Sequence, residues 1–173
     1  MSRINVPAPS FGKAEPHFSD AMAVRKPVFV VEQCIPLENE IDADDDRSWH
    51  FICYSTPPSL PVGTLRVVPP PHAHHEGEGV PHGGDGGHVK IGRFATLREF
   101  RGQGVGRAMV DAAIAWLESE GREEVDGWDG RVLAHAQVSV KGVWERLGFT
   151  VDERMGIWDE EGSVRPRVWI WRV

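Results

Sequence analysis

Short apolar runs rich in β-branched and aromatic residues recur along the chain, a pattern typical of strands. Two of these runs, 49–55 and 62–68, are separated and followed by prolines, and we expect them to form an antiparallel pair. Further strands are expected near residues 4–6, 89–97, 131–137, 150–157 and 164–173.

A helical periodicity appears in three other places. Apolar residues of the segment 108–120 recur at spacings of three and four, as in one face of an amphipathic helix: Val110, Ala113, Ile114 and Leu117. We expect Gly121 to end this helix. Ser139 is the expected N-cap of a short later helix, and Ser19 that of a first helix, which should kink or restart at Pro27.

The size and composition predict a single globular domain. The chain has 173 residues, 40% of them hydrophobic and 26% charged, enough for one buried core. We expect an extended lead-in over residues 1–18 and one domain over 19–173. The stretch 69–88 is rich in Pro, Gly and His and is expected to be a flexible loop. Its five histidines have no helical i, i+4 pair and no cysteine partner, so no metal site is expected.

The charge and the cysteine content narrow the class of protein. A net charge of −7 argues against a broad nucleic-acid surface, which needs clustered basic residues. The two cysteines, Cys34 and Cys53, are too few for a disulfide framework and are expected to be reduced thiols. No apolar run is long enough to cross a membrane, and residues 1–14 lack the pattern of a signal peptide. The expectation is a cytoplasmic protein with no membrane partner.

A glycine-rich turn joins the strand 89–97 to the helix 108–120. The turn has the sequence Arg-Gly-Gln-Gly-Val-Gly-Arg, residues 101–107. Glycines leave backbone N–H groups unshielded at a helix N-terminus, where the helix dipole also attracts anions. The flanking arginines can donate two hydrogen bonds each to phosphate oxygens. The segment therefore predicts a phosphate site.

Spacing separates three kinds of phosphate loop. A Walker loop requires Gly-Lys-Ser/Thr, and no lysine follows Gly106; a dinucleotide fingerprint requires a third glycine where this chain has Arg107. The pattern Arg/Gln-x-x-Gly-x-Gly/Ala is satisfied by Arg101, Gly104 and Gly106. In these residues the chain resembles the GNAT superfamily of acyl-CoA N-acyltransferases, in which this loop holds the pyrophosphate of coenzyme A.

Two more segments carry the same resemblance. Residues 25–33, Arg-x-x-Val-Phe-Val-Val-Glu-Gln, and residues 135–137, His-Ala-Gln, are similar to the ElaA-like branch of the superfamily. The elements over residues 19–173 follow the family's order. The resemblance implies an α/β (α+β) fold: a mixed, mostly antiparallel sheet flanked by helices, with two central strands that splay apart.

The resemblance also implies a cosubstrate, acetyl-CoA, and its binding residues. The pantetheine arm would lie against the backbone between the splayed strands, and the pyrophosphate against the amides of the glycine turn. Taken alone, Arg107 could equally be an exposed helix residue, and the glycines a plain tight turn. The implied cofactor-binding residues are Phe94, Ala95, Thr96, Arg101, Gly102, Gln103, Gly104, Val105, Gly106 and Arg107.

The sequence indicates less clearly which residues transfer protons in the reaction. Many GNAT enzymes have a tyrosine in the last helix that protonates the leaving thiolate; here Trp144 stands there, and an indole is not a practical acid. For the general base the candidates are Glu32 and His135. Glu32 could equally fix the following loop, and His135 could equally be a core histidine.

Six carboxylates fall between residues 38 and 46. They predict either a solvated loop or a negative rim that attracts a cationic amine. The resemblance implies an N-acetyltransferase, and the second interpretation favours a primary amine of a small molecule as its acceptor. A peptide or protein acceptor and a non-catalytic acyl-CoA-binding module remain alternatives. Three tryptophans near the C-terminus, at 158, 169 and 171, leave a homodimer open.

Overall fold

The computed structural model describes residues 3–72, 87–153, 157–158 and 167–172. The chain forms two compact units, each described here by itself: residues 1–68 with 92–124, and residues 69–91 with 125–173. The boundary passes through the strand β5 (Val89–Thr96), which contributes its first three residues to the second unit and its last five to the first.

The first unit contains a sheet in which the strands follow the order β1-β3-β4-β5, with β2 also paired to β3. The antiparallel ladder of β3 and β4 runs from Trp49↔Val67 to Ser55↔Leu60, with a register shift after Cys53. The bounds are β1 (Arg3–Asn5), β2 (Ser10–Phe11), β3 (Trp49–Thr56) and β4 (Leu60–Val68). The antiparallel pair expected from the apolar runs is confirmed.

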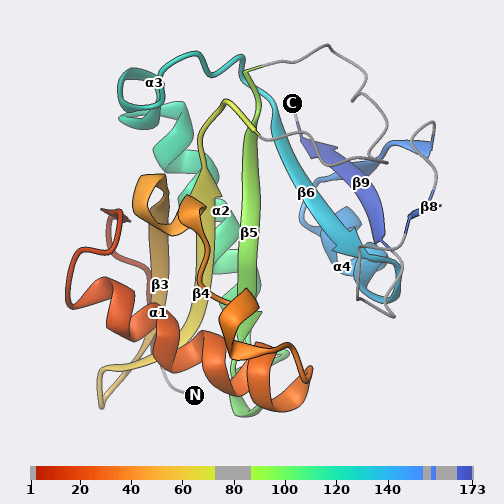
Figure 1. Cartoon of the computed structure of the whole chain (residues 1–173). Helices are drawn as coiled ribbons and strands as arrows, with labels where there is room; N and C mark the ends of the chain where they lie inside the picture. Colours follow the sequence, from red (N-terminus) through yellow and green to blue (C-terminus); the bar gives the residue numbers. More distant parts are fainter. Residues whose placement is uncertain (1–2, 73–86, 154–156, 159–166, 173) are drawn as a thin grey trace. The chain divides into compact units, whose positions relative to one another are not determined.

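Helices cover both faces of this sheet. Figure 1 shows α1 in front of the strands β3 and β4 and α2 behind them, and both helices pack on these two strands. The helical elements of the unit are α1 (His17–Arg25), the π-helix η1 (Lys26–Glu32), the 3-10 helices η2 (Leu37–Asn39), η3 (Ala43–Arg47) and η4 (Arg98–Phe100), α2 (Val105–Glu118) and α3 (Gly121–Glu124).

Two expected helix ends in this unit were wrong. The N-cap of α1 is Pro16 and not Ser19, whose backbone N–H instead donates to the Glu15 carboxylate. Gly121 does not terminate α2 but begins α3, and a Cβ there would lie 3.0 Å from the Trp116 carbonyl oxygen. The glycine is thus needed for a close approach. At Pro27 the helix restarts as the π-helix η1, with the proline in its first turn, where its missing N–H costs little.

The second unit is a smaller sheet built on β6 (Val132–Gln137). β6 pairs in parallel with β5 from Val89↔Val132 to Ile91↔Ala134, and antiparallel with β9 (Arg167–Arg172). The short strands β7 (Thr150–Val151) and β8 (Ile157–Trp158) both pair antiparallel with β9. Parallel and antiparallel pairs together make the mixed, mostly antiparallel sheet with flanking helices that was expected.

The short helix of this unit begins differently from the expectation. The 3-10 turn η5 (Val138–Val140) precedes α4 (Lys141–Arg146), so Val140 and not Ser139 is the N-cap. Gly148, just after the helix, has a φ of +88°, which is the left-handed conformation that glycine adopts without a steric penalty. The Gly-Phe ending of this segment therefore serves to turn the chain.

Candidate functional site

The glycine turn has the backbone geometry that its sequence predicts. Gly102 has a φ of +73° and Gly104 a φ of +86°, both in the left-handed region where a side chain is strained. Gly104 is the N-cap of α2, and no side chain caps that helix. A Cβ at Gly102 or Gly104 would meet no atom within 4 Å. The turn therefore presents a helix N-terminus with open space around two of its glycines.

Gly106, unlike the other two glycines of the turn, is required for close packing. A Cβ there would lie 3.0 Å from the Cζ atom of Phe94, so the glycine lets α2 approach the β5 side chain closely. On the neighbouring strand, a Cβ at Gly63 would lie only 2.6 Å from Val105 Cγ1. These close contacts bring the start of α2 against β4 and β5. They place Val105 and Gly106 next to Phe94, another predicted cofactor residue.

Arg101 uses its guanidinium within the protein. Its Nε donates to the Thr96 carbonyl at 3.0 Å, and Nη1 and Nη2 each donate to one carboxylate oxygen of Glu32 at 2.7 Å. The two side chains of this pair are 41% and 39% exposed, so solvent and solutes reach them. The hydrogen bonds that Arg101 donates to Glu32 raise the pKa of Arg101. A phosphate that binds Arg101 would have to displace Glu32.

The two candidate bases lie in different units. Glu32 ends η1 in the first unit and is paired with Arg101. His135 lies on β6 in the second unit, half-buried between the buried residues Ala134 and Ala136, and pairs in register with Trp169. Of the remaining predicted residues, Gln103 donates to the Glu99 carbonyl at 2.7 Å, and Ala95 is buried.

Trp144, at the position of the family's tyrosine, is a packing residue. Its side chain is buried, and its ring meets Phe149 edge to face at a centroid distance of 4.9 Å. Such a contact stabilises the short helix α4 against the start of β7.

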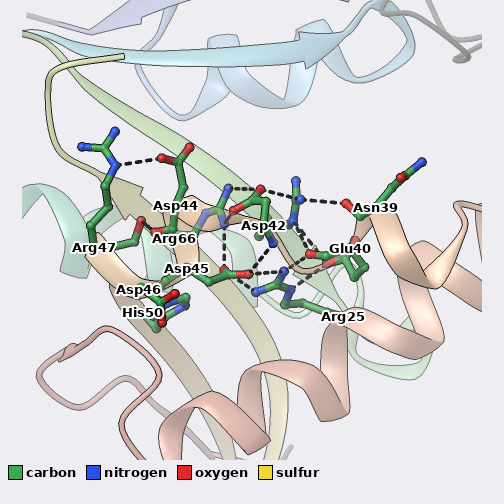
Figure 2. A network of polar contacts seen from close by, with 12 residues as sticks. Arg25, Asn39, Glu40, Asp42, Asp44, Asp45, Asp46, Arg47, His50 and Arg66 are labelled. Carbon is green, nitrogen blue, oxygen red and sulfur yellow. Dashed lines mark hydrogen bonds and ion pairs between the residues drawn. The ribbon is translucent and has the colours of Figure 1, made fainter. Parts of the chain in front are cut away.

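The acidic stretch departs from both expectations, a solvated loop and a negative rim, at its two buried carboxylates. Glu40 and Asp45 are 1% and 0% exposed and are surrounded by arginines, as Figure 2 shows. The cluster, hereafter the arginine–carboxylate cluster, has three cations and three anions: Arg25, Arg66, Arg93, Glu40, Asp42 and Asp45. Its charges balance, so both expectations for the stretch are corrected. Within the described acidic stretch, Glu38 and Asp46 are exposed, and Asp42 and Asp44 are partly exposed.

Short contacts connect all six members. Arg25 donates to Glu40 Oε1 at 2.6 Å and to Asp45 Oδ1 at 2.8 Å. Arg66 donates to Asp42 at 2.6 and 3.0 Å and to Asp45 at 2.7 Å. Arg93 donates to Asp42 Oδ2 at 2.8 Å. Buried charges remain ionised only when they are compensated in this way.

The surroundings shift the pKa values of the carboxylates in opposite directions. Burial raises the pKa of Asp45, but the hydrogen bond from Arg25 and the nearby arginine charges outweigh it and hold the pKa at about 2. Burial also raises the pKa of Asp42, but the hydrogen bond and charge of Arg66 outweigh this effect, so the pKa of Asp42 is lowered. Burial dominates at Glu40, whose pKa is raised despite Arg93 and Arg25.

The sequence contains one signal for this cluster, which the expectations above did not use. Arg25 follows the buried Val24, and Arg66 lies within the apolar run Leu65–Val68. A charged residue in a buried position requires a partner of opposite charge, and the acidic stretch 38–46 supplies it. Arg93, on β5, belongs to this cluster as well.

Most of the histidine-rich loop, residues 73–86, lies outside the described part of the chain. At its edges, the rings of His72 and His88 stack at 4.6 Å, and His72 Nε2 lies 2.9 Å from the His88 carbonyl oxygen. Burial lowers the pKa of His88 to about 4, and the charge of His72 adds to this effect. Among the described residues no group of three potential ligands could hold a metal ion.

The architecture and the turn match known acetyltransferases. The model of the acetyltransferase (GNAT) family matches residues 18–149, a stretch that includes α1, the sheet strands β3 to β6, the glycine turn and α4. The chain belongs to the GNAT family. Within the described residues, no helix has the length and apolar character needed to cross a membrane.

Relatives and solved structures agree with this assignment. The uncharacterized N-acetyltransferase YjcF of Bacillus subtilis is 27% identical over 139 residues, which cover 80% of this chain and 82% of YjcF. A predicted N-acetyltransferase from Lactobacillus plantarum is 26% identical, with a TM-score of 0.70 and coverage of 99% and 97% of the two chains. Escherichia coli ElaA, at 21% identity, shares the fold over the full length of both chains with a TM-score of 0.65.

Proposed function

We propose that this chain transfers an acetyl group from acetyl-CoA to a primary amine of a small molecule. The observation that carries the proposal is the turn 101–107, whose left-handed glycines open an uncapped helix N-terminus within a GNAT domain. Backbone N–H groups at such a terminus, together with the helix dipole, suit a pyrophosphate. GNAT acetyltransferases use acetyl-CoA, which supplies an acyl group on a good leaving thiol.

The proposed cofactor contacts follow the chain from β5 into α2. The backbone at Phe94, Ala95 and Thr96 would bind the pantetheine arm, and the amides of the turn would bind the pyrophosphate. Arg107 would add charge from the first turn of α2, and Arg101 would do so after exchanging its carboxylate partner for phosphate. Gln103 and Val105 would contribute through the main chain.

The chemistry is a direct attack of amine nitrogen on the thioester carbonyl. The N–C bond forms, the C–S bond breaks, the ammonium loses a proton, and the thiolate takes one up. Glu32 and His135 both remain candidates for the base: Glu32 is engaged by Arg101 here and would be released when Arg101 binds phosphate, whereas His135 lies on β6. Trp144 supplies no acid, so the thiolate would take its proton from solvent.

The acceptor is the least constrained part of the proposal. The charge balance of the arginine–carboxylate cluster removes the electrostatic argument for a cationic acceptor, so the primary amine rests on the family's chemistry alone. An assay therefore has to include peptide N-termini and lysine side chains beside small amines. We keep the exclusion of nucleic acid, which rests on the net charge of −7.

A second candidate function is a non-catalytic acyl-CoA-binding module. The buried Trp144 favours it, because the position that could protonate the thiolate is occupied by an apolar packing residue. Such a module would bind the coenzyme and leave the thioester intact.

Calorimetry with acetyl-CoA and a free-thiol assay over a panel of amines and peptides would test these functions. Micromolar binding with amine-dependent thiol release supports the transferase; binding without release supports the module; no binding overturns both. The informative variant is Gly104→Ala, and Gly127→Ala is its matched control, since Gly127 also has a positive φ of +70° and no atom within 4 Å of a Cβ. Only the first should weaken acetyl-CoA binding.

A further inference from the structure

Arg93 has an unusual backbone for a residue inside a strand. Its φ is +48°, whereas β5 continues as a strand on both sides of it. A side chain in the left-handed region is strained, and such a residue persists only when its surroundings hold it there. It also turns the neighbouring peptide groups out of the regular alternation of the strand. The residues that follow it directly are Phe94, Ala95 and Thr96.

The Arg93 side chain is held by a short stretch of the loop before β3. Nη2 donates to Asp42 Oδ2 at 2.8 Å and to the Asn39 carbonyl at 3.2 Å, while Nε donates to the Glu40 carbonyl at 3.2 Å. The Glu40 carboxylate lies 3.3 Å from the same Nε. Four contacts from three residues, Asn39, Glu40 and Asp42, thus oppose the relaxation of Arg93 to an ordinary strand conformation.

The loop that holds Arg93 is itself fixed from the other side. Asp42 and Asp45 form a reciprocal capping box at the start of η3. Arg25, with a fully buried side chain, donates to both Glu40 and Asp45. The direct pair Arg93–Asp42 is 24% and 37% exposed, but the loop that carries it is fixed by the buried side chains of Arg25, Glu40 and Asp45, which oppose the strain of the Arg93 backbone.

We propose that Asp42 and Glu40 are positioning residues of the transferase, which act through Arg93 to hold the main chain at Phe94–Thr96 in its acyl-CoA-binding conformation. This inference rests on the proposed function. It gives the acidic stretch a role that is neither solvation nor attraction of the acceptor: its carboxylates fix a strained strand. Misplacement of a main-chain donor by a fraction of an ångström would lower the rate of acyl transfer.

The test compares four single variants. Asp42→Asn removes the charge that holds Arg93, and Asp46→Asn is the matched control, because Asp46 lies in the same 3-10 helix, is exposed, and pairs with Lys13 instead. Arg93→Gly removes the anchor but leaves a residue that adopts a positive φ freely, whereas Arg93→Ala removes the anchor and keeps the strain. Arg93 is the most exposed arginine of the cluster, at 24%, and Glu40 and Asp42 keep Arg25 and Arg66 as partners when it is replaced.

Hydrogen exchange gives a readout that does not depend on activity. We expect amides at Phe94–Thr96 to exchange about tenfold faster in Asp42→Asn, with β3 amides and the Asp46→Asn control unchanged. We expect Arg93→Gly to exchange more slowly at these amides than Arg93→Ala. The opposite order of glycine and alanine is what a plain strand residue would give, because glycine weakens regular strands, and it would overturn the inference.

Kinetics then connect the conformation to the reaction. In thiol-release assays we expect Asp42→Asn to lower kcat about tenfold with a smaller change in the KM for acetyl-CoA, and Arg93→Gly to retain several times the kcat of Arg93→Ala. Equal kcat values for these two Arg93 variants would also contradict the inference.

If Asp42→Asn does not fold, the comparison of Arg93→Gly with Arg93→Ala decides alone. If the wild type neither binds nor cleaves acetyl-CoA, the proposed function fails, while hydrogen exchange still decides whether the cluster holds β5.

Discussion

The glycine turn and the arginine–carboxylate cluster lie in the same unit, and both contain arginines and carboxylates in contact. In the turn, the pair Arg101–Glu32 is about 40% exposed on each side. In the cluster, Arg25 and Asp45 are fully buried. A surface pair can exchange partners with solvent or a ligand at little cost, whereas a buried one cannot lose a member without leaving an uncompensated charge. The turn is thus suited to binding, and the cluster to holding a conformation.

The largest effect is expected from a break in the cluster's centre. Asp45→Asn removes the carboxylate shared by Arg25 and Arg66 and leaves both cations buried beside fewer anions. We expect the free energy of unfolding to fall by about 3 kcal/mol or more. Urea denaturation followed by circular dichroism measures it, with Asp46→Asn as the control that should change stability by less than about 0.5 kcal/mol. A small effect at Asp45 would remove the contrast between the two regions.

Acid should weaken the cluster through Asp45 at low pH. The folded-state pKa of Asp45 is about 2, below its ordinary value of 3.8, so its contribution is fully present above pH 4. That contribution, about 2 kcal/mol, is lost as the pH falls from 4 towards 2. The raised pKa of Glu40 has the opposite sign and offsets part of it. Stability measured from pH 6 to pH 2 should fall less steeply in Asp45→Asn; parallel curves would contradict this assignment.

The same acid titration should show a separate step from the second unit. His88 has a folded-state pKa of about 4 against an ordinary 6.5, because burial and the nearby charge of His72 disfavour its charged form. Its contribution is present above pH 6.5 and is lost as the pH falls from 6.5 towards 4. We expect His88→Gln to flatten the stability curve in that range, and to leave the range from 4 to 2 unchanged.

A substitution in the glycine turn should weaken acetyl-CoA binding more than it lowers the free energy of unfolding. In Gly104→Ala the φ of +86° costs an alanine about 1 kcal/mol, and the strain distorts the presumed pyrophosphate site. We expect about tenfold weaker acetyl-CoA binding by calorimetry. Gly127→Ala should lose similar stability with unchanged affinity. Equal affinities for the two variants would mean that the turn does not bind the coenzyme.

The smallest effect is expected at the exposed pair of the turn. Glu32→Gln releases Arg101 from a competing carboxylate, and such surface pairs contribute less than about 1 kcal/mol to stability. We expect unchanged stability and about threefold tighter acetyl-CoA binding, an effect that fades at high salt. Unchanged affinity at low salt would show that Arg101 serves only to tie β5 to η1.

The sequence predicted best the regions whose structure depends on residues close together in the chain, and worst those held by distant partners. The strands β3 and β4, the helix α2 and the glycine turn depend on neighbours in the chain, and they were predicted within a few residues. Expected caps at Ser19 and Ser139 were wrong because cap geometry depends on where the preceding chain enters the helix. The burial of Glu40 and Asp45 was missed because carboxylates are ordinarily exposed, and their partners lie on α1, β4 and β5.

The sequence by itself determined the family, the order of the elements and the glycine turn, since each depends on local pattern and backbone preference. Only the tertiary structure decided which charged side chains are buried and which partners they contact. The contacts of Arg25, Arg66 and Arg93 span from 15 to 54 residues of chain, and a charged side chain is assigned to solvent, substrate or core only by the partners that folding brings to it. The acidic stretch thus became part of a neutral interior because three arginines from separate elements reach it.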